Sequence, residues 1–171
     1  MAGFLNPSEV LKNLKLKPDM VAADFGCGSG GWVLPLAKIL EDGQVFAIDL
    51  LEEPLSALRS KAKTEKINNI MTIKSDVEKI SRMGSSSCDL VLMTNLLFQC
   101  EDKKAVLEEG KRIMKKGAKL LVVDWKNDSA LGPSETRVSA DEIKKAAEES
   151  GFEIASEFEA SSFHWGLILA K

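Results

Sequence analysis

The stretch "ADFGCGSGG", residues 23–31, decides how this chain folds. Gly26, Gly28 and Gly30 alternate with other residues in it, and Asp24 stands two positions ahead of the first glycine. The apolar residues before the glycines predict a buried strand, and those after them predict a helix. A glycine-rich turn between the two lets the backbone approach a nucleotide-like ligand closely. A carboxylate at this point would repel a phosphate, so Asp24 bears directly on which ligand the loop takes.

Strand-like and helix-like apolar patterns alternate along the rest of the chain. We expect strands over 20–25, 43–50, 70–76, 88–95 and 118–126, and helices over 7–16, 31–40, 52–66, 102–115 (stopped by Gly117) and 139–151 (with Ser139 and Glu142 as a capping box). Two closing strands, 152–159 and 163–171, are joined by a few residues and must be antiparallel neighbours. The order predicts an α/β fold in one domain, residues 1–171: a doubly wound, mostly parallel seven-stranded sheet with an antiparallel C-terminal hairpin.

Polar residues follow the expected strands at their carboxyl ends. Asp49, Asp76, Asn95 and Asp124 each stand at or just after such an end, as the glycine loop does. In a doubly wound sheet the ligand binds at the carboxyl ends of the strands, where the strand order reverses. These residues are therefore predicted to surround one cleft.

The acidic residues indicate a cationic ligand rather than a pyrophosphate. The glycines with Asp49, about 20 residues further on, also fit the dinucleotide fingerprint, but Asp24 opposes a phosphate. Asp49 is suited to two vicinal ribose hydroxyls, because charge-assisted hydrogen bonds are stronger than neutral ones. Asp49 as a solvated strand-end acid is the alternative, and Asp76 could also cap a short helix beginning at Val77.

At this point the chain resembles the Rossmann-like (class I) S-adenosylmethionine-dependent methyltransferases. "DFGCGSG" is similar to their D-x-G-x-G-x-G motif, "AIDL" to the strand whose final acid holds the ribose, and "KSDVEKI" to the segment whose acid lies by the adenine amino group. "CDLVLMTNLLF" resembles the fourth-strand motif, whose end, residues 95–98, borders cofactor and substrate. The nearest resemblance is to small-molecule methyltransferases of the quinone-biosynthesis type.

The resemblance implies that S-adenosylmethionine binds and that S-adenosylhomocysteine leaves as the product. The cofactor-binding residues that it implies are Asp24, Gly26, Cys27, Gly28, Gly30, Asp49, Leu50, Asp76, Val77 and Asn95. It also implies an N-terminal helical segment, residues 1–18, near the cofactor site. Two rival functions remain open. One is an NAD-dependent oxidoreductase, and the other is a non-catalytic module that binds S-adenosylmethionine without turnover.

Methyl transfer from a sulfonium requires mainly that an acceptor be aligned by in-line approach and desolvated. A general base is needed only where the acceptor is protonated, so the catalytic group is not marked by a motif. His164, the only histidine, is the candidate for a substrate contact or base. The alternative is a surface or strand-pairing histidine. The acceptor is expected to be a small molecule, and its reacting atom, O, N, S or C, stays open.

No sizeable lid is inserted in the sequence, so the outer wall of the cleft must come from short segments. These are residues 1–8, 96–102, 126–138 and the turn before His164. Either the substrate is held openly, the first residues fold over the cofactor, or a second chain covers it, as a homo-oligomer or a partner.

Composition limits the other classes of function. The net charge of −3 over 171 residues argues against a nucleic-acid binder, and the basic run 111–119 is expected to be the solvated end of a helix. No apolar run reaches membrane-spanning length, and the first residues do not resemble a secretory signal. Three cysteines without pairing or metal-ligand spacing indicate free thiols in a reducing cytoplasm and no metal site.

Overall fold

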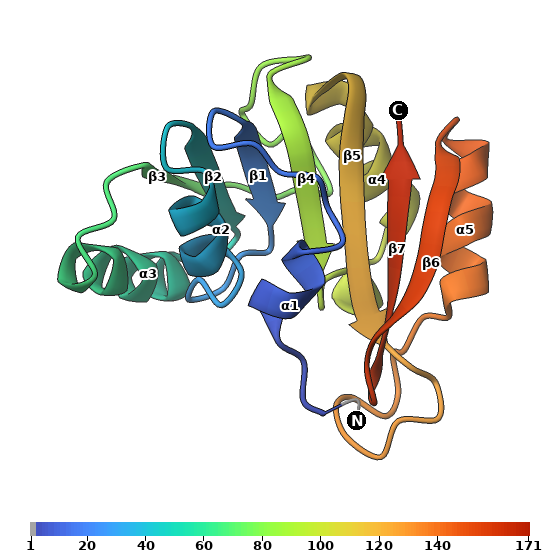
Figure 1. Ribbon diagram of the computed structural model, residues 1–171. Helices are drawn as coiled ribbons and strands as arrows, with labels where there is room; N and C mark the ends of the chain where they lie inside the picture. The colour runs from blue at the N-terminus through green and yellow to red at the C-terminus, as the bar shows by residue number, and fades with distance from the viewer. Residues whose placement is uncertain (1–2) are drawn as a thin grey trace.

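The computed structural model describes residues 3–171, which form one seven-stranded sheet flanked by helices (Figure 1). The strand order is β3-β2-β1-β4-β5-β7-β6. The strands are β1 (Val21–Phe25), β2 (Gln44–Asp49), β3 (Ile70–Lys74), β4 (Cys88–Thr94), β5 (Met114–Trp125), β6 (Glu153–Ser161) and β7 (His164–Ala170). The pairs among β1 to β5 are parallel, whereas β7 runs antiparallel to both β5 and β6. The predicted fold class is confirmed, including the closing hairpin.

Helices cover both faces of the sheet (Figure 1). They are α1 (Pro7–Leu11), α2 (Val33–Ile39), α3 (Glu52–Thr64), α4 (Lys103–Ile113) and α5 (Ala140–Glu149), with a short 3₁₀ turn, η1 (Leu97–Gln99), after β4. Apolar side chains of α1, α2 and α3 pack with one face, and those of α4 and α5 pack with the other. The predicted capping box of α5 is confirmed, because Ser139 and Glu142 bond each other's backbone amides.

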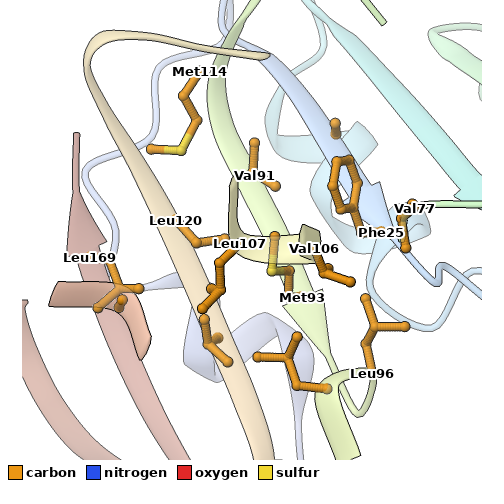
Figure 2. Close-up of a cluster of buried hydrophobic side chains, with 14 of the residues drawn as sticks. Phe25, Val77, Val91, Met93, Leu96, Val106, Leu107, Met114, Leu120 and Leu169 are labelled. Atoms are coloured by element: carbon orange, nitrogen blue, oxygen red, sulfur yellow. The ribbon is translucent and has the colours of Figure 1, made fainter. Parts of the chain in front are cut away.

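The core under α4 is made by alternate residues of the central strands. Figure 2 shows Val91 and Met93 of β4 pointing into the same cluster as Val106 and Leu107 of α4. All four side chains are fully buried. Burial of apolar groups of this size stabilises a fold by roughly 1.5–3 kcal/mol each, so the central strands form a rigid base for the residues at their ends.

The helix expected over 7–16 is shorter than predicted. It ends at Leu11, and the amides of residues 12–14 donate to carbonyls three residues back instead of four. The chain thus tightens into a turn directly after Leu11, while Leu14 is still buried. The apolar spacing signals burial here, and the backbone achieves that burial without a longer helix.

The end of α4 also differs from the prediction, because Gly117 does not stop the helix. The helix ends at Ile113 and β5 begins at Met114, and both of these side chains are fully buried. Cys88 pairs with Met114 and Leu90 with Lys119, so the β5 residues between them form a bulge. Gly117 adopts φ +79° there, as a bulge can require. The basic run 111–119 is therefore split between a helix end and a strand.

Candidate functional site

The glycine loop between β1 and α2 needs glycine for its backbone conformation. Gly26, Gly28 and Gly30 have φ values of +67°, +53° and +92°, in the region that other residues rarely adopt. A Cβ atom at Gly30 would also come within 2.3 Å of the Leu58 side chain. The Cys27 amide donates to the Ile48 carbonyl at 3.0 Å, which ties the loop to the end of β2.

A cleft of about 360 Å³ opens beside this loop at the carboxyl ends of β1, β2 and β3. Its lining residues are Gly26, Gly28, Asp49, Leu50, Leu51, Pro54, Ser75, Asp76, Val77, Glu78, Leu96, Gln99 and Cys100. Six of the ten predicted cofactor-binding residues are among them. The other four, Asp24, Cys27, Gly30 and Asn95, lie in or next to the same strand ends and glycine loop without lining the cleft.

Asp49 ends β2 and faces the glycine loop. Its Oδ2 accepts the Gly28 amide at 2.9 Å, and its Oδ1 accepts the Leu51 amide at 3.0 Å. A carboxylate has about four lone-pair sites, so both oxygens keep capacity for further donors. The two amides fix the carboxylate at the cleft, in the arrangement that a diol-binding acid needs.

Asp24 lies at the penultimate position of β1 and is fully buried. Neither carboxyl oxygen has a hydrogen-bond partner. Burial, followed by the negative charge of Asp49, raises the pKa of Asp24 well above its ordinary value. A buried polar group without a partner costs about 1–3 kcal/mol. A ligand that brings a positive charge and N–H donors would remove that cost, so the site fits the cationic end of S-adenosylmethionine.

Asp76 follows β3 and shapes the turn at the far side of the cleft. Its Oδ1 accepts the Glu78 amide at 3.0 Å, and Lys79 Nζ lies 3.3 Å from its Oδ2. Residues 77–79 form a turn and a bend, so the alternative prediction of a short helix capped by Asp76 is wrong. Val77, next to it, is buried against the core cluster of Figure 2.

The end of β4 is held in an unusual conformation. Asn95 has φ +51°, and its backbone N–H donates to the Val123 carbonyl at 2.8 Å. The side-chain oxygen Oδ1 of Asn95 is buried without a partner. Asp124 of β5 accepts the amides of Phe98 (3.2 Å) and Trp125 (2.8 Å). Burial raises the pKa of Asp124 to about 6, against the effect of these amides. Asp124 therefore organises the segment after β4.

His164 begins β7 opposite Trp125, the last residue of β5. The imidazole is buried, its Nδ1 lies 2.9 Å from Ser161 Oγ, and its Nε2 is buried without a partner. The Trp125 and His164 ring centroids are 4.0 Å apart. Burial, followed by the positive charge of Lys126, lowers the pKa of His164 to about 4. The ring is therefore neutral near pH 7.

Glu78 and Gln99 also line the cleft. Gln99 lies in the segment 96–102 that was expected in the outer wall, whereas Glu78 was missed by sequence reasoning. Glu78 Oε2 accepts the Asp102 amide at 2.8 Å, and Gln99 Nε2 donates to the Asn95 carbonyl at 2.9 Å. Nothing in the spacing of Glu78 marks it, because only the turn at Asp76 brings it to the cleft.

Three further properties concern the whole described chain. Among residues 3–171, no group of three or more His, Cys, Asp or Glu side chains has the arrangement of a metal site. No helix within this range is long and apolar enough to span a membrane. Cys27, Cys88 and Cys100 are free and buried.

Comparison with known proteins identifies a family. A family model described as "Methyltransferase domain" matches residues 23–122. A demethylmenaquinone methyltransferase of Bacillus mycoides is 25% identical over 125 residues, 72% of this chain and 52% of that protein. The chain thus spans about half the length of the curated relatives it matches.

Solved structures agree over nearly the whole length. An S-adenosylmethionine-dependent methyltransferase from Aquifex aeolicus superposes with a TM-score of 0.90 at 29% identity, over 96% of this chain and 89% of that one. A putative type 11 methyltransferase from Sulfolobus solfataricus gives 0.75 at 25% identity, over 99% and 94%. Because the family model covers more than half of the chain and the cleft fits the cofactor, the chain belongs to the S-adenosylmethionine-dependent methyltransferases of the Rossmann-like class.

Proposed function

We propose that this protein transfers a methyl group from S-adenosylmethionine to a small-molecule acceptor by in-line displacement. The observation that carries the proposal is Asp24, a fully buried carboxyl group without a partner beside the glycine loop. The pyrophosphate of a cofactor such as NAD would gain nothing from this group. S-adenosylmethionine supplies an already activated methyl group on a sulfonium, with an ammonium group nearby.

The other cleft residues take separate parts of the cofactor in this proposal. Asp49 accepts the ribose hydroxyls, and Asp76 lies by the adenine amino group. Leu50 is 59% exposed at the cleft edge, and with Val77 it offers an apolar wall for the flat base. The amides of the glycine loop remain available for the carboxylate of the cofactor.

The methyl acceptor binds beyond β1 from the adenine and ribose, at the ends of β4, β5 and β7. With adenine at β3 and ribose at β2, the reactive end of the cofactor points toward β1 and β4. Asn95 directly follows β4, and its buried Oδ1 has no partner. The demethylmenaquinone methyltransferase relatives favour a small-molecule acceptor. The three buried free thiols are consistent with a reducing cytoplasm.

Calorimetric titration with S-adenosylmethionine, S-adenosylhomocysteine and NAD tests the cofactor assignment. We expect saturable binding of the first two, and saturable binding of NAD alone would contradict it. Incubation with methyl-labelled S-adenosylmethionine and a panel of hydroxyl, amine and thiol metabolites then tests turnover. Binding without label transfer to any member, in the presence of a control enzyme that does turn over, would favour the non-catalytic module.

A further inference from the structure

The hydrogen-bond partners of His164 decide which of its nitrogens carries the proton. Ser161 Oγ accepts the Phe163 amide at 3.1 Å and lies 2.9 Å from His164 Nδ1. If the Ser161 hydroxyl donates to Nδ1, the proton of the neutral imidazole must sit on Nε2. If Nδ1 carried it instead, the buried Ser161 hydroxyl would have no acceptor and Nε2 would still be unpartnered. The first arrangement leaves one unsatisfied group, and the second leaves two.

His164 Nε2–H is therefore a buried donor that lacks an acceptor. A buried donor without an acceptor lowers the stability of the fold by about 1–3 kcal/mol. The imidazole stays neutral near pH 7, so protonation does not relieve this cost. The geometry favours a hydrogen-bond donor over a general base, because Nε2 is already protonated in the tautomer that Ser161 supports. An oxygen atom brought by a ligand is the partner that this nitrogen lacks.

The surroundings of His164 select the kind of oxygen. The Trp125 indole packs on the imidazole with ring planes 39° apart, and the rings of Phe4 and Phe163 lie 6.0 Å apart at the adjoining turn. Lys126 is the cation close enough to affect the imidazole, and its Nζ is also paired with Glu159 at 2.8 Å. Aromatic walls with a nearby cation suit a flat ring that carries a negative oxygen.

We propose that His164 Nε2–H donates a hydrogen bond to a phenolate or enolate oxygen on a flat ring of the methyl acceptor. The inference rests on the proposed function and adds to it the chemical class of the acceptor. His164 stands on the next strand beyond β5 from Asn95, so the acceptor would lie across the end of β5, between the cofactor side and β7. There His164 orients the ring and stabilises its anionic form.

The segment over Trp125 provides a route for such a ligand. A Cβ atom at Gly132 would lie 2.5 Å from the Trp125 ring, so residues around Gly132 cover that ring directly. Arg137 donates to the carbonyls of Asn127, Leu131 and Pro133. Among residues 3–171, the hydrogen bonds of 127–137 all stay within the segment 126–138. Residues 127–137 can therefore move away from Trp125 as a unit, while Lys126 and Val138 keep their hydrogen bonds to Phe163 and Trp165.

Nuclear magnetic resonance of the single histidine tests the tautomer without any need for turnover. In protein labelled with ¹⁵N and free of an added histidine tag, we expect the Nε2–H form to dominate at pH 7.5. Ser161→Ala should shift the balance toward the Nδ1–H form, whereas Ser156→Ala, at an exposed position of the same strand, should not. A dominant Nδ1–H form in the wild type would overturn the proposal.

Binding of a probe tests the ligand class. We expect 4-nitrophenolate, ionised at pH 8.5, to shift the His164 Nε2–H resonance, and nitrobenzene, which lacks the oxyanion, to leave it unchanged. His164→Gln keeps an N–H donor and should bind 4-nitrophenolate within about threefold of wild type, whereas His164→Leu should bind it about 10- to 100-fold more weakly. No resonance shift, or equal binding by His164→Leu, would overturn the proposal. Because these readings need no S-adenosylmethionine, failure of cofactor binding would count against the proposed function alone.

Discussion

Replacing Asp24 by asparagine should weaken cofactor binding while it stabilises the free protein at high pH. The two side chains have nearly the same shape, so the change removes the charge without opening a cavity. Asp24 is fully buried with both oxygens unpartnered, and burial raises its pKa. Between the ordinary aspartate pKa and the raised one, the folded state holds a proton that the unfolded state has lost. Stability therefore falls as pH rises through this window, and the variant should lack that fall.

The expected affinity loss follows from the hydrogen bonds that a carboxylate makes to a cation. One such bond contributes about 1.5–3 kcal/mol, which corresponds to roughly 10- to 150-fold in Kd. Binding of a cation should also drive the proton off Asp24. At a pH below the raised pKa, the wild type should release up to about one proton per S-adenosylmethionine bound, and affinity should rise up to about tenfold per pH unit.

Isothermal titration in phosphate and in Tris at the same pH measures that proton, because the two buffers differ in ionisation enthalpy. S-adenosylhomocysteine, which keeps the ammonium and lacks the sulfonium, shows which cation Asp24 faces. Asp19→Asn is the matched control, because Asp19 is exposed before β1. If Asp24→Asn binds S-adenosylmethionine as tightly as the wild type with the same proton release, Asp24 does not meet the cation and our reasoning about the site is wrong.

Three other predictions concern single residues. Asp49→Ala should weaken S-adenosylmethionine binding at least about tenfold by calorimetry, whereas Asp42→Ala, at an exposed turn, should not; equal effects would remove the ribose role. Glu109→Gln should lower the free energy of unfolding by about 1.5–3 kcal/mol, because buried Glu109 accepts hydrogen bonds from Ser81 and Arg112. These bonds also lower the pKa of Glu109, against the effect of burial. Denaturant titrations should therefore show the stability difference between wild type and variant shrinking below pH 4.5. His164 should titrate near pH 4 by NMR. Because the unfolded state takes up this proton at higher pH than the folded state, the wild type should lose about 2 kcal/mol of unfolding free energy relative to His164→Gln between pH 7 and 5. Parallel curves of unfolding free energy against pH for the two proteins would contradict this.

The cleft was predictable because parallel strands end at one edge of a sheet. Asp49 and Asp76 each follow an apolar run, and alternation of strands with helices fixes which ends meet. The glycine spacing adds the loop between them. These local patterns have a spatial result that topology dictates, and they brought Gly26, Gly28, Asp49 and Asp76 to the cleft. Leu50 and Val77 were added by the family resemblance. Asn95 and Asp124, which were also expected around the cleft, do not line it.

The features that the sequence did not predict depend on contacts between residues that are distant in the sequence. A helical pattern continues through residues 111–116, yet burial of Met114 beside Cys88 draws the chain into the sheet. Glu78 is brought to the cleft by the turn at Asp76 and there accepts a bond from the Asp102 amide, 24 residues further along the chain. Nothing in the spacing around His164 shows that Ser161 faces its Nδ1, and that contact changes the interpretation from a base to a donor.

Most of the buried polar groups that lack a hydrogen-bond partner lie at the proposed site. Among residues 3–171, buried side-chain atoms without a partner belong to Asp24, Asn95, Ser150 and His164. Three of the four stand at the same edge of the sheet, on β1, after β4 and at the start of β7. At about 1–3 kcal/mol each, they are a large burden for a fold whose net stability is of the order of 5–15 kcal/mol. A requirement of folding alone would not gather them at one edge. A cationic cofactor at Asp24 and an anionic acceptor at His164, with β4 and β5 between them, would supply the missing partners.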